Sequence, residues 1–190
     1  MKFLRMLLMI NCVTFSGLLF AKINNFHEIE TDDNGFAMYR YGQPSREGVR
    51  ELCDKGVQEV MVLSGNAKDH EFKYQDECPG LKVIYNIKQS STTPVTKEFL
   101  ETFDKWVADS KEQGKKIAFR CACGCHRTGR LAAYYQMKYQ HVSLEDALLL
   151  MKKHGKYMFL MPHLIPQVKD MHDYLAGLPC AQKEKHCIVR

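Results

Sequence analysis

The fold class is decided by Ile117-Ala118-Phe119-Arg120-Cys121-Ala122-Cys123-Gly124-Cys125-His126-Arg127-Thr128-Gly129-Arg130. Residues 116–119 form a short apolar run typical of a buried strand. A helical pattern follows over about residues 127–140, so only a tight loop separates the two elements. A buried strand that passes directly into a helix is the building unit of α/β proteins. We therefore take this segment as the centre of the domain and extend the prediction outward from it.

The remaining chain alternates strand and helix patterns. Strands are predicted over 36–41, 57–63 and 81–87, and helices over 45–55, 95–113, 143–154 and 163–176. Ser45 and Ser143 are predicted N-caps, and Gly56 and Gly114 are predicted helix stops. Residues 22–35 are predicted to be an extended polar lead-in that ends in a turn at 32–35. We predict one α/β domain over residues 22–190, in three layers, with a mostly parallel central sheet covered by helices on both faces.

The loop between the strand and the helix suits an anion. A helix start presents unpaired N–H groups and a partial positive charge, and a tight loop can direct several N–H groups to one point. Gly124 gives the backbone freedom that such a curl needs, and Arg127 offers a planar fork to two phosphate oxygens. The predicted phosphate-binding residues are Ala122, Cys123, Gly124, Cys125, His126 and Arg127.

The same surroundings predict a reactive Cys121. A free thiol has a pKa near about 8.5, and helix starts with nearby cations lower it to about 3.5–7.5. Cys121 would then be a thiolate that attacks phosphorus, and water would hydrolyse the resulting thiophosphate. Thr128 can donate its hydroxyl to the sulfur when the sulfur departs. The predicted catalytic residues are Cys121, Arg127 and Thr128, with His126 added below.

Cys121-x-x-Gly124-x-x-Arg127-Thr128-Gly129 resembles the signature loop of the protein tyrosine phosphatase superfamily. The resemblance implies a phosphatase-like fold, a nucleophilic Cys121, a phosphate-binding Arg127 and a Thr128 that assists the leaving thiolate. Residues 39–44 resemble the arginine-glycine-proline segment of small dual-specificity-like phosphatases. His126-Arg127-Thr128-Gly129 is similar to the loop ending of atypical members that act on inositol pyrophosphates.

Two features depart from the family pattern. Arg120 stands where the family usually has His, and no carboxylate lies between Glu77 and Glu98, where its general acid Asp is expected. His126 is the first candidate for the proton donor, because some relatives carry an Asp there and an imidazole pKa of about 6.5 suits proton transfer. Asp76 or Glu77 is the second candidate. Alternatively, His126 only supports the loop.

Other interpretations of the cysteine cluster remain open. Cys-x-Cys-x-Cys-His could bind zinc, could be purely structural, or could belong to an inactive phosphate-binding module. Cys123 and Cys125 are interpreted as small fillers that point away from the ligand, with a protective disulfide to Cys121 as the alternative. Neither a metal nor another cofactor is predicted. Arg40, Lys88 and Arg130 are possible cations at the rim, although a solvated role is preferred for each.

The N-terminus has the layout of a secretory signal peptide over residues 1–21. Lys2 and Arg5 precede an apolar run over 6–20, with cleavage expected after Ser16 or Ala21. That run is short for a membrane span of about twenty residues, although an uncleaved anchor or a buried helix is the alternative. The mature protein is therefore expected to be secreted or periplasmic, with no membrane partner.

Charge and cysteine content fit this expectation. The chain carries 27 basic and 22 acidic residues, and removal of the signal peptide would leave 25 basic residues, a balance too weak to indicate nucleic acid. Seven cysteines would remain in an oxidising compartment, where thiols pair. Cys180 with Cys187 is the easiest pair, and Cys53 with Cys78 is possible.

The expected reaction is metal-independent hydrolysis of a phosphate monoester. An exported enzyme meets few phosphotyrosine proteins of its own cell, and a secreted branch of the superfamily, the phosphatase-like phytases, degrades inositol hexakisphosphate. An inositol polyphosphate is therefore the preferred substrate and a phosphorylated small molecule the expected partner. The alternatives are a protein tyrosine or dual-specificity phosphatase and an inactive binding module.

Overall fold

The computed structural model describes residues 23–189. The predicted signal peptide lies outside these residues. The strands are β1 His27–Thr31, β2 Ala37–Tyr41, β3 Glu59–Val62, β4 Lys82–Tyr85 and β5 Lys116–Arg120. The helices are α1 Arg46–Asp54, α2 Lys97–Glu112, α3 Arg127–Tyr139, α4 Leu144–Lys153 and α5 Leu164–Leu175. Short 3-10 helices lie between these elements or in the tail: η1 Ala67–Asp69, η2 Gln75–Glu77, η3 Met158–Leu160 and η4 Glu184–His186.

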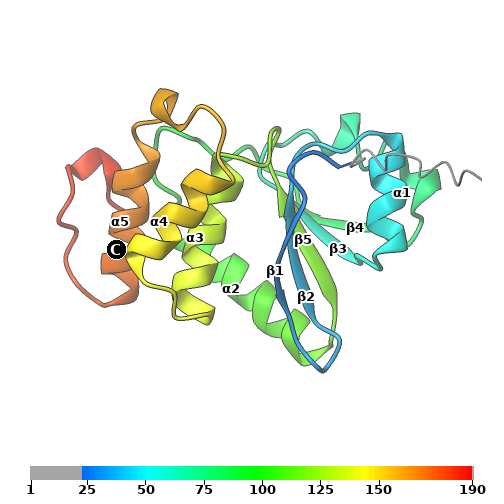
Figure 1. Ribbon diagram of the computed structural model, residues 1–190, viewed down its shortest axis with the longest axis horizontal. Helices are drawn as coiled ribbons and strands as arrows, with labels where there is room; N and C mark the ends of the chain where they lie inside the picture. The colour runs from blue at the N-terminus through cyan, green and yellow to red at the C-terminus, as the bar shows by residue number, and fades with distance from the viewer. Residues whose placement is uncertain (1–22, 190) are drawn as a thin grey trace, which may run out of the picture.

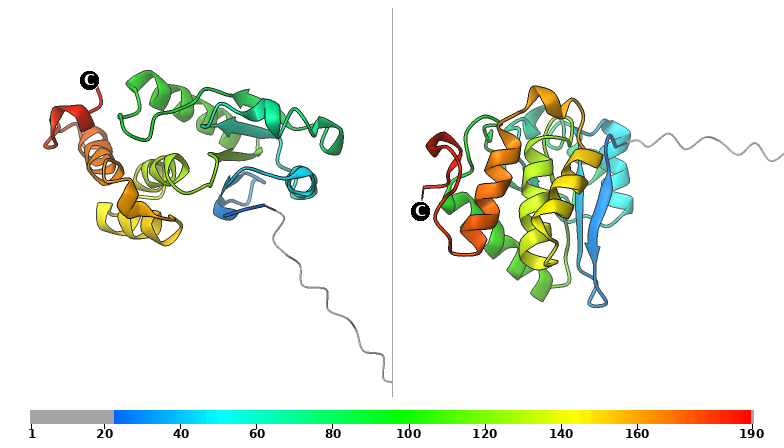
Figure 2. Two further views of the ribbon diagram at one scale, coloured as in Figure 1. Left: turned by 90° about the horizontal axis from the view of Figure 1, so that it is seen from above. Right: turned by 60° about the vertical axis from the view of Figure 1, so that its left-hand side comes forward.

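The five strands form one sheet in the order β1-β2-β5-β3-β4 (Figure 1). All neighbouring pairs are parallel except β1 with β2, which are antiparallel. Helix α1 covers one face, and α2 to α5 cover the other (Figures 1 and 2). The predicted three-layer α/β fold with a mostly parallel sheet is confirmed. The predicted polar lead-in contains β1, a strand that sequence analysis missed.

Side chains alternate across the central strands and so divide the core in two. Met38 of β2 and Phe119 of β5 face the side of α2 to α5, whereas Tyr39 and Ala118 face α1. By the same two-residue period, Arg40 and Arg120 at the carboxyl ends of these strands point to opposite faces. Both arginines are therefore carried into the interior next to the loop that follows β5.

The predicted helix ends agree with the structure. Ser45 and Ser143 accept hydrogen bonds from the amides of Gly48 and Asp146, as N-caps do. Gly56 and Gly114 follow the helices α1 and α2 with φ of 75° and 60°, a left-handed conformation that glycine adopts without steric cost. Helix α2 begins slightly later than predicted, because Thr96 caps it.

Two disulfides form, Cys53–Cys78 and Cys180–Cys187. Both are pairs that the sequence suggested, and they leave Cys121, Cys123 and Cys125 as thiols. The first disulfide joins α1 to the residue that follows η2, and the second closes the tail beyond α5. Within residues 23–189, none of the helices combines the length and the apolar character needed to span a bilayer.

Candidate active site

The loop from Cys121 to Arg127 is pressed against the backbone that follows β2. Gly124 has φ of 70°, and a Cβ at this position would lie 2.6 Å from the carbonyl carbon of Tyr41 and the nitrogen of Gly42. The Gln43 amide donates to the Ala122 carbonyl at 2.9 Å. Two glycines, Gly42 and Gly124, thus permit a backbone-to-backbone contact that fixes the curl of the loop.

The curl leaves the loop amides without protein acceptors. Among the described residues, only the Cys125 amide of the run from Ala122 to Arg127 has an acceptor, the Cys123 sulfur at 3.1 Å. Buried or half-buried N–H groups normally find a partner. Several unpaired amides at a helix start form a nest for an anion, so the loop is built for an oxyanion such as phosphate.

Cys121 lies at the base of this loop, 1% exposed and free of any disulfide. A hydrogen bond from the Cys123 thiol is the largest cause of a Cys121 pKa well below its usual value. Contacts with the hydroxyl and amide of Thr128 and the charge of Arg127 lower this pKa further, against the effect of burial. The surroundings of the sulfur therefore favour the thiolate.

Thr128 lies where it can serve the departing sulfur. Its hydroxyl is fully buried and forms no hydrogen bond within the described part of the chain. It nevertheless lies close enough to the Cys121 sulfur to lower the pKa of that thiol. The role that the sequence assigns to Thr128 stays a prediction.

Cys123 and Cys125 differ from each other. Cys125 is buried, and its sulfur donates to the Cys123 carbonyl at 3.2 Å and accepts from the Asn25 side chain at 3.7 Å, as a structural filler would. Cys123 is half-buried, and its bond with Cys121, together with burial, raises its pKa. Cys123 therefore remains a protonated donor beside Cys121, a role that the interpretation of Cys123 as a filler did not include.

Arg127, at the start of α3, is half-buried. Its Nη1 donates to the carbonyls of Leu63 at 3.1 Å and Gln89 at 3.4 Å. These bonds fix the guanidinium between β3 and the segment after β4. They leave Nε and Nη2 without acceptors among residues 23–189, and these are the two donors that can form a fork on phosphate.

Arg40 is not a solvated rim cation. It is 3% exposed and donates from Nη2 to the Gly124 carbonyl at 2.6 Å. Burial lowers its pKa to about 10, while the negative charge of the loop cysteines opposes this shift. Asn25 donates to the same Gly124 carbonyl at 2.9 Å. Sequence analysis missed both of these contacts with the loop. For Arg40, its position inside a predicted central strand could have indicated a buried role.

The preferred solvated role is also wrong for Arg130, which is 1% exposed. It donates to the carbonyls of Ser90 and Thr93 at 2.8 Å each and to the Gln167 side chain. Arg130 therefore fastens the polar segment 88–94 to helices α3 and α5, along one side of the active site. Lys88 is exposed, as expected.

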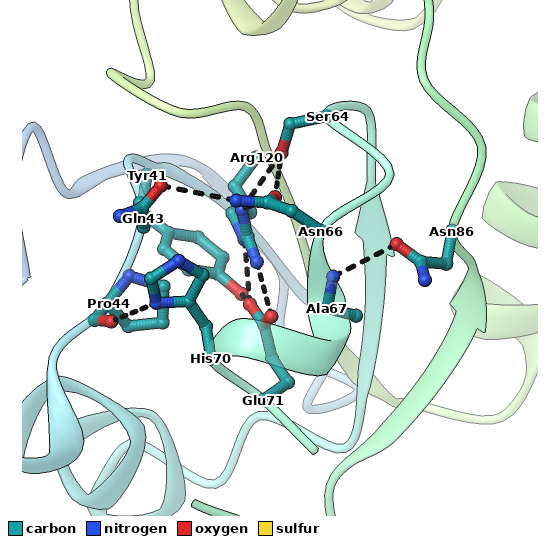
Figure 3. Close-up of polar contacts among 10 residues, drawn as sticks. All are labelled: Tyr41, Gln43, Pro44, Ser64, Asn66, Ala67, His70, Glu71, Asn86 and Arg120. Atoms are coloured by element: carbon teal, nitrogen blue, oxygen red, sulfur yellow. Dashed lines mark hydrogen bonds and ion pairs between the residues drawn. The ribbon is translucent and has the colours of Figure 1, made fainter. Parts of the chain in front are cut away.

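Arg120 precedes Cys121 at the position where the resembled family usually has His. It forms a buried ion pair with Glu71 (Figure 3). Both side chains are 0% exposed. The guanidinium also donates to Ser64 at 2.9 Å and to Asn66 at 2.8 Å, and Tyr41 donates to Glu71 at 3.2 Å. This network fixes the loop after β3 beside the segment that carries Cys121. The sequence showed the unusual Arg120 but gave no sign of its partner.

The proton-donor candidates lie in different surroundings. His126 bonds through Nε2 to the Lys156 carbonyl at 2.6 Å, and its Nδ1 lies 3.8 Å from the Cys123 sulfur. The ring is thus part of the loop wall. Asp76 and Glu77 instead form ion pairs with Arg46 of α1 at 2.6 and 2.5 Å, where they stabilise the opposite layer.

The cysteine cluster does not have the geometry of a zinc site. In the part of the chain that the structure describes, the potential ligand atoms that gather within 4.8 Å of one another belong to Asp170, Cys180 and Cys187. Two of these are joined in a disulfide. Cys121, Cys123 and Cys125 form no such group.

The profile of the dual specificity phosphatase catalytic domain matches residues 42–173. The chain belongs to this family. This family is part of the cysteine-dependent protein tyrosine phosphatase superfamily that the loop resembles. The matched span runs from Gly42, which contacts the loop, to Asp173 near the end of α5. A curated relative is the tyrosine-protein phosphatase MSG5 of Saccharomyces cerevisiae, 27% identical over 115 residues, which are 58% of this chain and 21% of MSG5. The chain thus spans about a fifth of the length of that relative.

Solved structures of phosphatases share the fold. The catalytic core of the PP-IP phosphatase SIW14 from S. cerevisiae has a TM-score of 0.60 at 17% identity, over 79% of this chain and 87% of that one. P. aeruginosa TpbA in complex with pTyr has a TM-score of 0.58 at 18% identity, over 83% of this chain and 97% of that one. At these identities the likeness concerns the fold alone.

Proposed function

We propose that this chain is a metal-independent phosphate monoester hydrolase that acts through a covalent intermediate on Cys121. The observation that carries the proposal is a buried Cys121 that forms no disulfide and lies beneath a loop most of whose amides lack acceptors within residues 23–189. The lowered pKa of Cys121 supports it. An anion of the size of phosphate supplies those acceptors. The position of Arg127, with two free guanidinium nitrogens, supports the same conclusion.

In the first step the Cys121 sulfur attacks phosphorus as the ester bond to the leaving oxygen breaks. Loop amides and Arg127 stabilise the negative charge on the oxygens that do not leave. In the second step water attacks phosphorus, the sulfur–phosphorus bond breaks, and the thiolate returns. Thr128 donates to that thiolate, which makes it a better leaving group.

His126 is the proposed proton donor to the leaving oxygen. Its Nε2 is engaged with the Lys156 carbonyl at 2.6 Å, so Nδ1 is the ring nitrogen that can carry a transferable proton. His126→Ala should slow poor leaving groups, such as alkyl phosphates, more than activated aryl phosphates. An equal loss on both would instead make His126 a support of the loop. Gln89→Ala, on the neighbouring segment, is a control without a titratable group.

Inositol polyphosphates such as inositol hexakisphosphate are the proposed substrates. The His126-Arg127-Thr128-Gly129 ending supports this choice, and so does the shared fold with a protein described as a PP-IP phosphatase. We assign the binding of further phosphates to two exposed cations, Lys88 after β4 and Lys156, whose backbone carbonyl contacts His126. The proposal extends to a secreted or periplasmic enzyme, because the two disulfides suit an oxidising compartment.

A protein tyrosine or dual-specificity phosphatase is the second candidate, supported by the identity to MSG5. Purified protein should be assayed with inositol hexakisphosphate, a phosphotyrosine peptide and an activated aryl phosphate. Preferential turnover of the inositol phosphate supports the lead proposal, and preference for the peptide supports the second. Binding without phosphate release would indicate an inactive module. Activity that survives Cys121→Ser, or that chelators abolish, would contradict the mechanism itself.

A further inference from the structure

The segment between α4 and α5 presents large apolar side chains to water. Tyr157, Phe159 and Leu160 are 69%, 78% and 63% exposed. We refer to residues 155–162 as the apolar tip, drawn in orange above α4 and α5 in Figure 1. Isolated apolar side chains are normal on a surface, but several gathered at one place mark an interaction site.

The apolar tip is an ordered turn. The Leu160 amide donates to the Tyr157 carbonyl at 2.9 Å, and the Met161 amide donates to the Met158 carbonyl at 3.0 Å. Met158 and Met161 pack partly buried against the main core. Because the two methionines anchor the turn, the side chains of Tyr157, Phe159 and Leu160 are held outward. Nothing in the described structure covers them.

Exposed lysines precede the apolar tip in sequence, and one lies within it. Lys152, Lys153 and Lys156 are exposed, and the sequence has no Asp or Glu from Ala147 to Lys169. A short apolar projection flanked by lysines is the composition of segments that lie at a membrane interface. The charge specifies an anionic surface, because each such lysine is attracted to acidic headgroups.

A cationic pocket adjoins the apolar tip. Its volume is about 330 Å³, and its lining runs from Pro162 and His163 across to Lys183, Lys185 and His186 of the tail. His186 is 6% exposed, yet its Nδ1 has no hydrogen-bond partner within residues 23–189. The rings of His163 and His186 lie 5.5 Å apart. The Cys180–Cys187 disulfide fixes this part of the tail.

We propose that the apolar tip and the cationic pocket together dock onto an anionic phospholipid bilayer. The outward side chains of the tip enter the boundary between headgroups and acyl chains, and the pocket receives a headgroup phosphate. The 2.6 Å bond between His126 and the Lys156 carbonyl would then place the catalytic loop at the headgroup layer. This docking is peripheral, and the side chains that enter the bilayer, those of Tyr157, Phe159 and Leu160, take no part in the proposed reaction.

A tryptophan placed in the apolar tip tests the proposal directly. Phe159→Trp in the full chain should show a blue-shifted emission with phosphatidylcholine vesicles that contain phosphatidylglycerol, and quenching by brominated acyl chains. The native Trp106 is 7% exposed and gives a constant background. Leu178→Trp, at a site 50% exposed beyond the far end of α5, is the matched control and should not respond. No response from position 159 would overturn the proposal, as would an equal response to pure phosphatidylcholine.

Partition variants test the two halves separately. Tyr157→Ser with Phe159→Ser and Leu160→Ser should lower vesicle partitioning roughly tenfold or more, whereas Phe72→Ser on the α1 side should not. Residues 1–21 are identical in all variants, so their contribution to vesicle partitioning cancels in the comparison.

The pocket is tested by Lys183→Gln with Lys185→Gln, which should weaken binding to the anionic vesicles. Millimolar inorganic phosphate should compete only weakly with the vesicles if a lipid headgroup is the ligand. Unchanged partitioning in the tip variant, or complete competition by phosphate, would refute docking. Turnover of a soluble aryl phosphate should be retained throughout, which separates this result from the catalytic proposal.

Discussion

At the scale of single residues, the active site is built on buried cations. Arg40, Arg120 and Arg130 are each 3% exposed or less, and among residues 23–189 only Arg120 of these three has a carboxylate partner. Burial lowers the pKa of Arg40 and of Arg130 to about 10, while the negative charge on Cys121 opposes the shift in both. These two guanidinium groups therefore gain from an anion in the loop, and they favour both the thiolate and a bound phosphate.

The Arg120–Glu71 pair gives a prediction on stability. Glu71→Gln leaves a buried guanidinium uncompensated and should lower the free energy of unfolding by about 3–5 kcal/mol. Asp109→Asn breaks the exposed Lys105–Asp109 pair and should cost about 1 kcal/mol or less. Urea denaturation of both variants measures the difference. Equal losses would show that the buried network does not stabilise the domain.

Cys123 gives a prediction on pH. The nucleophile loses its charge as the pH falls through its pKa, and the Cys123 thiol is the largest cause that lowers this pKa. Cys123→Ala should therefore move the acid limb of Cys121 alkylation to higher pH. The loss of a hydrogen bond to a charged group, about 1.5–3 kcal/mol, corresponds to a shift of about one to two pH units. Cys125→Ala should leave the limb in place, and an unshifted limb in Cys123→Ala would contradict this role.

At the scale of elements, the catalytic loop depends on one close backbone contact. The sequence correctly predicted a strand, a tight loop and a helix here, because the apolar run, Gly124 and the helical pattern are all local signals. It could not predict the buried roles of Arg40 and Arg130, because their acceptors, among them Gly124, Ser90 and Thr93, are distant in sequence. Strand β1 was missed for a similar reason, since its polar residues form a strand only beside β2.

The glycine contact can be tested with a matched pair. Gly124 and Gly177 have nearly the same φ, 70° and 68°, but only Gly124 has backbone within contact distance of a new Cβ. Gly177→Ala should lower the free energy of unfolding by about 1 kcal/mol, because the left-handed backbone conformation is its only cost. Gly124→Ala should cost more and should abolish turnover, because the loop must move. Wild-type turnover in Gly124→Ala would contradict the proposed curl.

At the scale of the whole molecule, two disulfides close loops in different parts of the domain, one on the α1 side and one in the tail beyond α5. Cys53–Cys78 closes a sequence separation of 25 residues and Cys180–Cys187 one of 7. The chain-entropy argument gives about 3.5 kcal/mol for the longer loop and about 2.4 kcal/mol for the shorter one. The double variants Cys53→Ser/Cys78→Ser and Cys180→Ser/Cys187→Ser should follow that order in thermal unfolding. The reverse order would point to strain or to residual structure in the unfolded chain.

The fold class and the helix ends could be predicted because composition, periodicity and capping are local properties. Of the cysteine pairs, Cys180 with Cys187 could be chosen because the two lie close in sequence, whereas Cys53 with Cys78 was one possible pairing that only the structure decides. Substrate choice could not, since it depends on which cations, apolar groups and loops surround the catalytic cysteine in space. The apolar tip is an example: its sequence resembles ordinary core, and only the structure shows its side chains exposed.

The central claim is that phosphate passes through a bond to Cys121. Rapid acid quenching during turnover of an aryl phosphate, followed by digestion and mass spectrometry, measures that intermediate directly. The account predicts a phosphorylated peptide that contains Cys121, formed within the first turnover and absent from Cys121→Ser. Turnover without any phosphorylated Cys121 peptide, and persisting in Cys121→Ser, would contradict it.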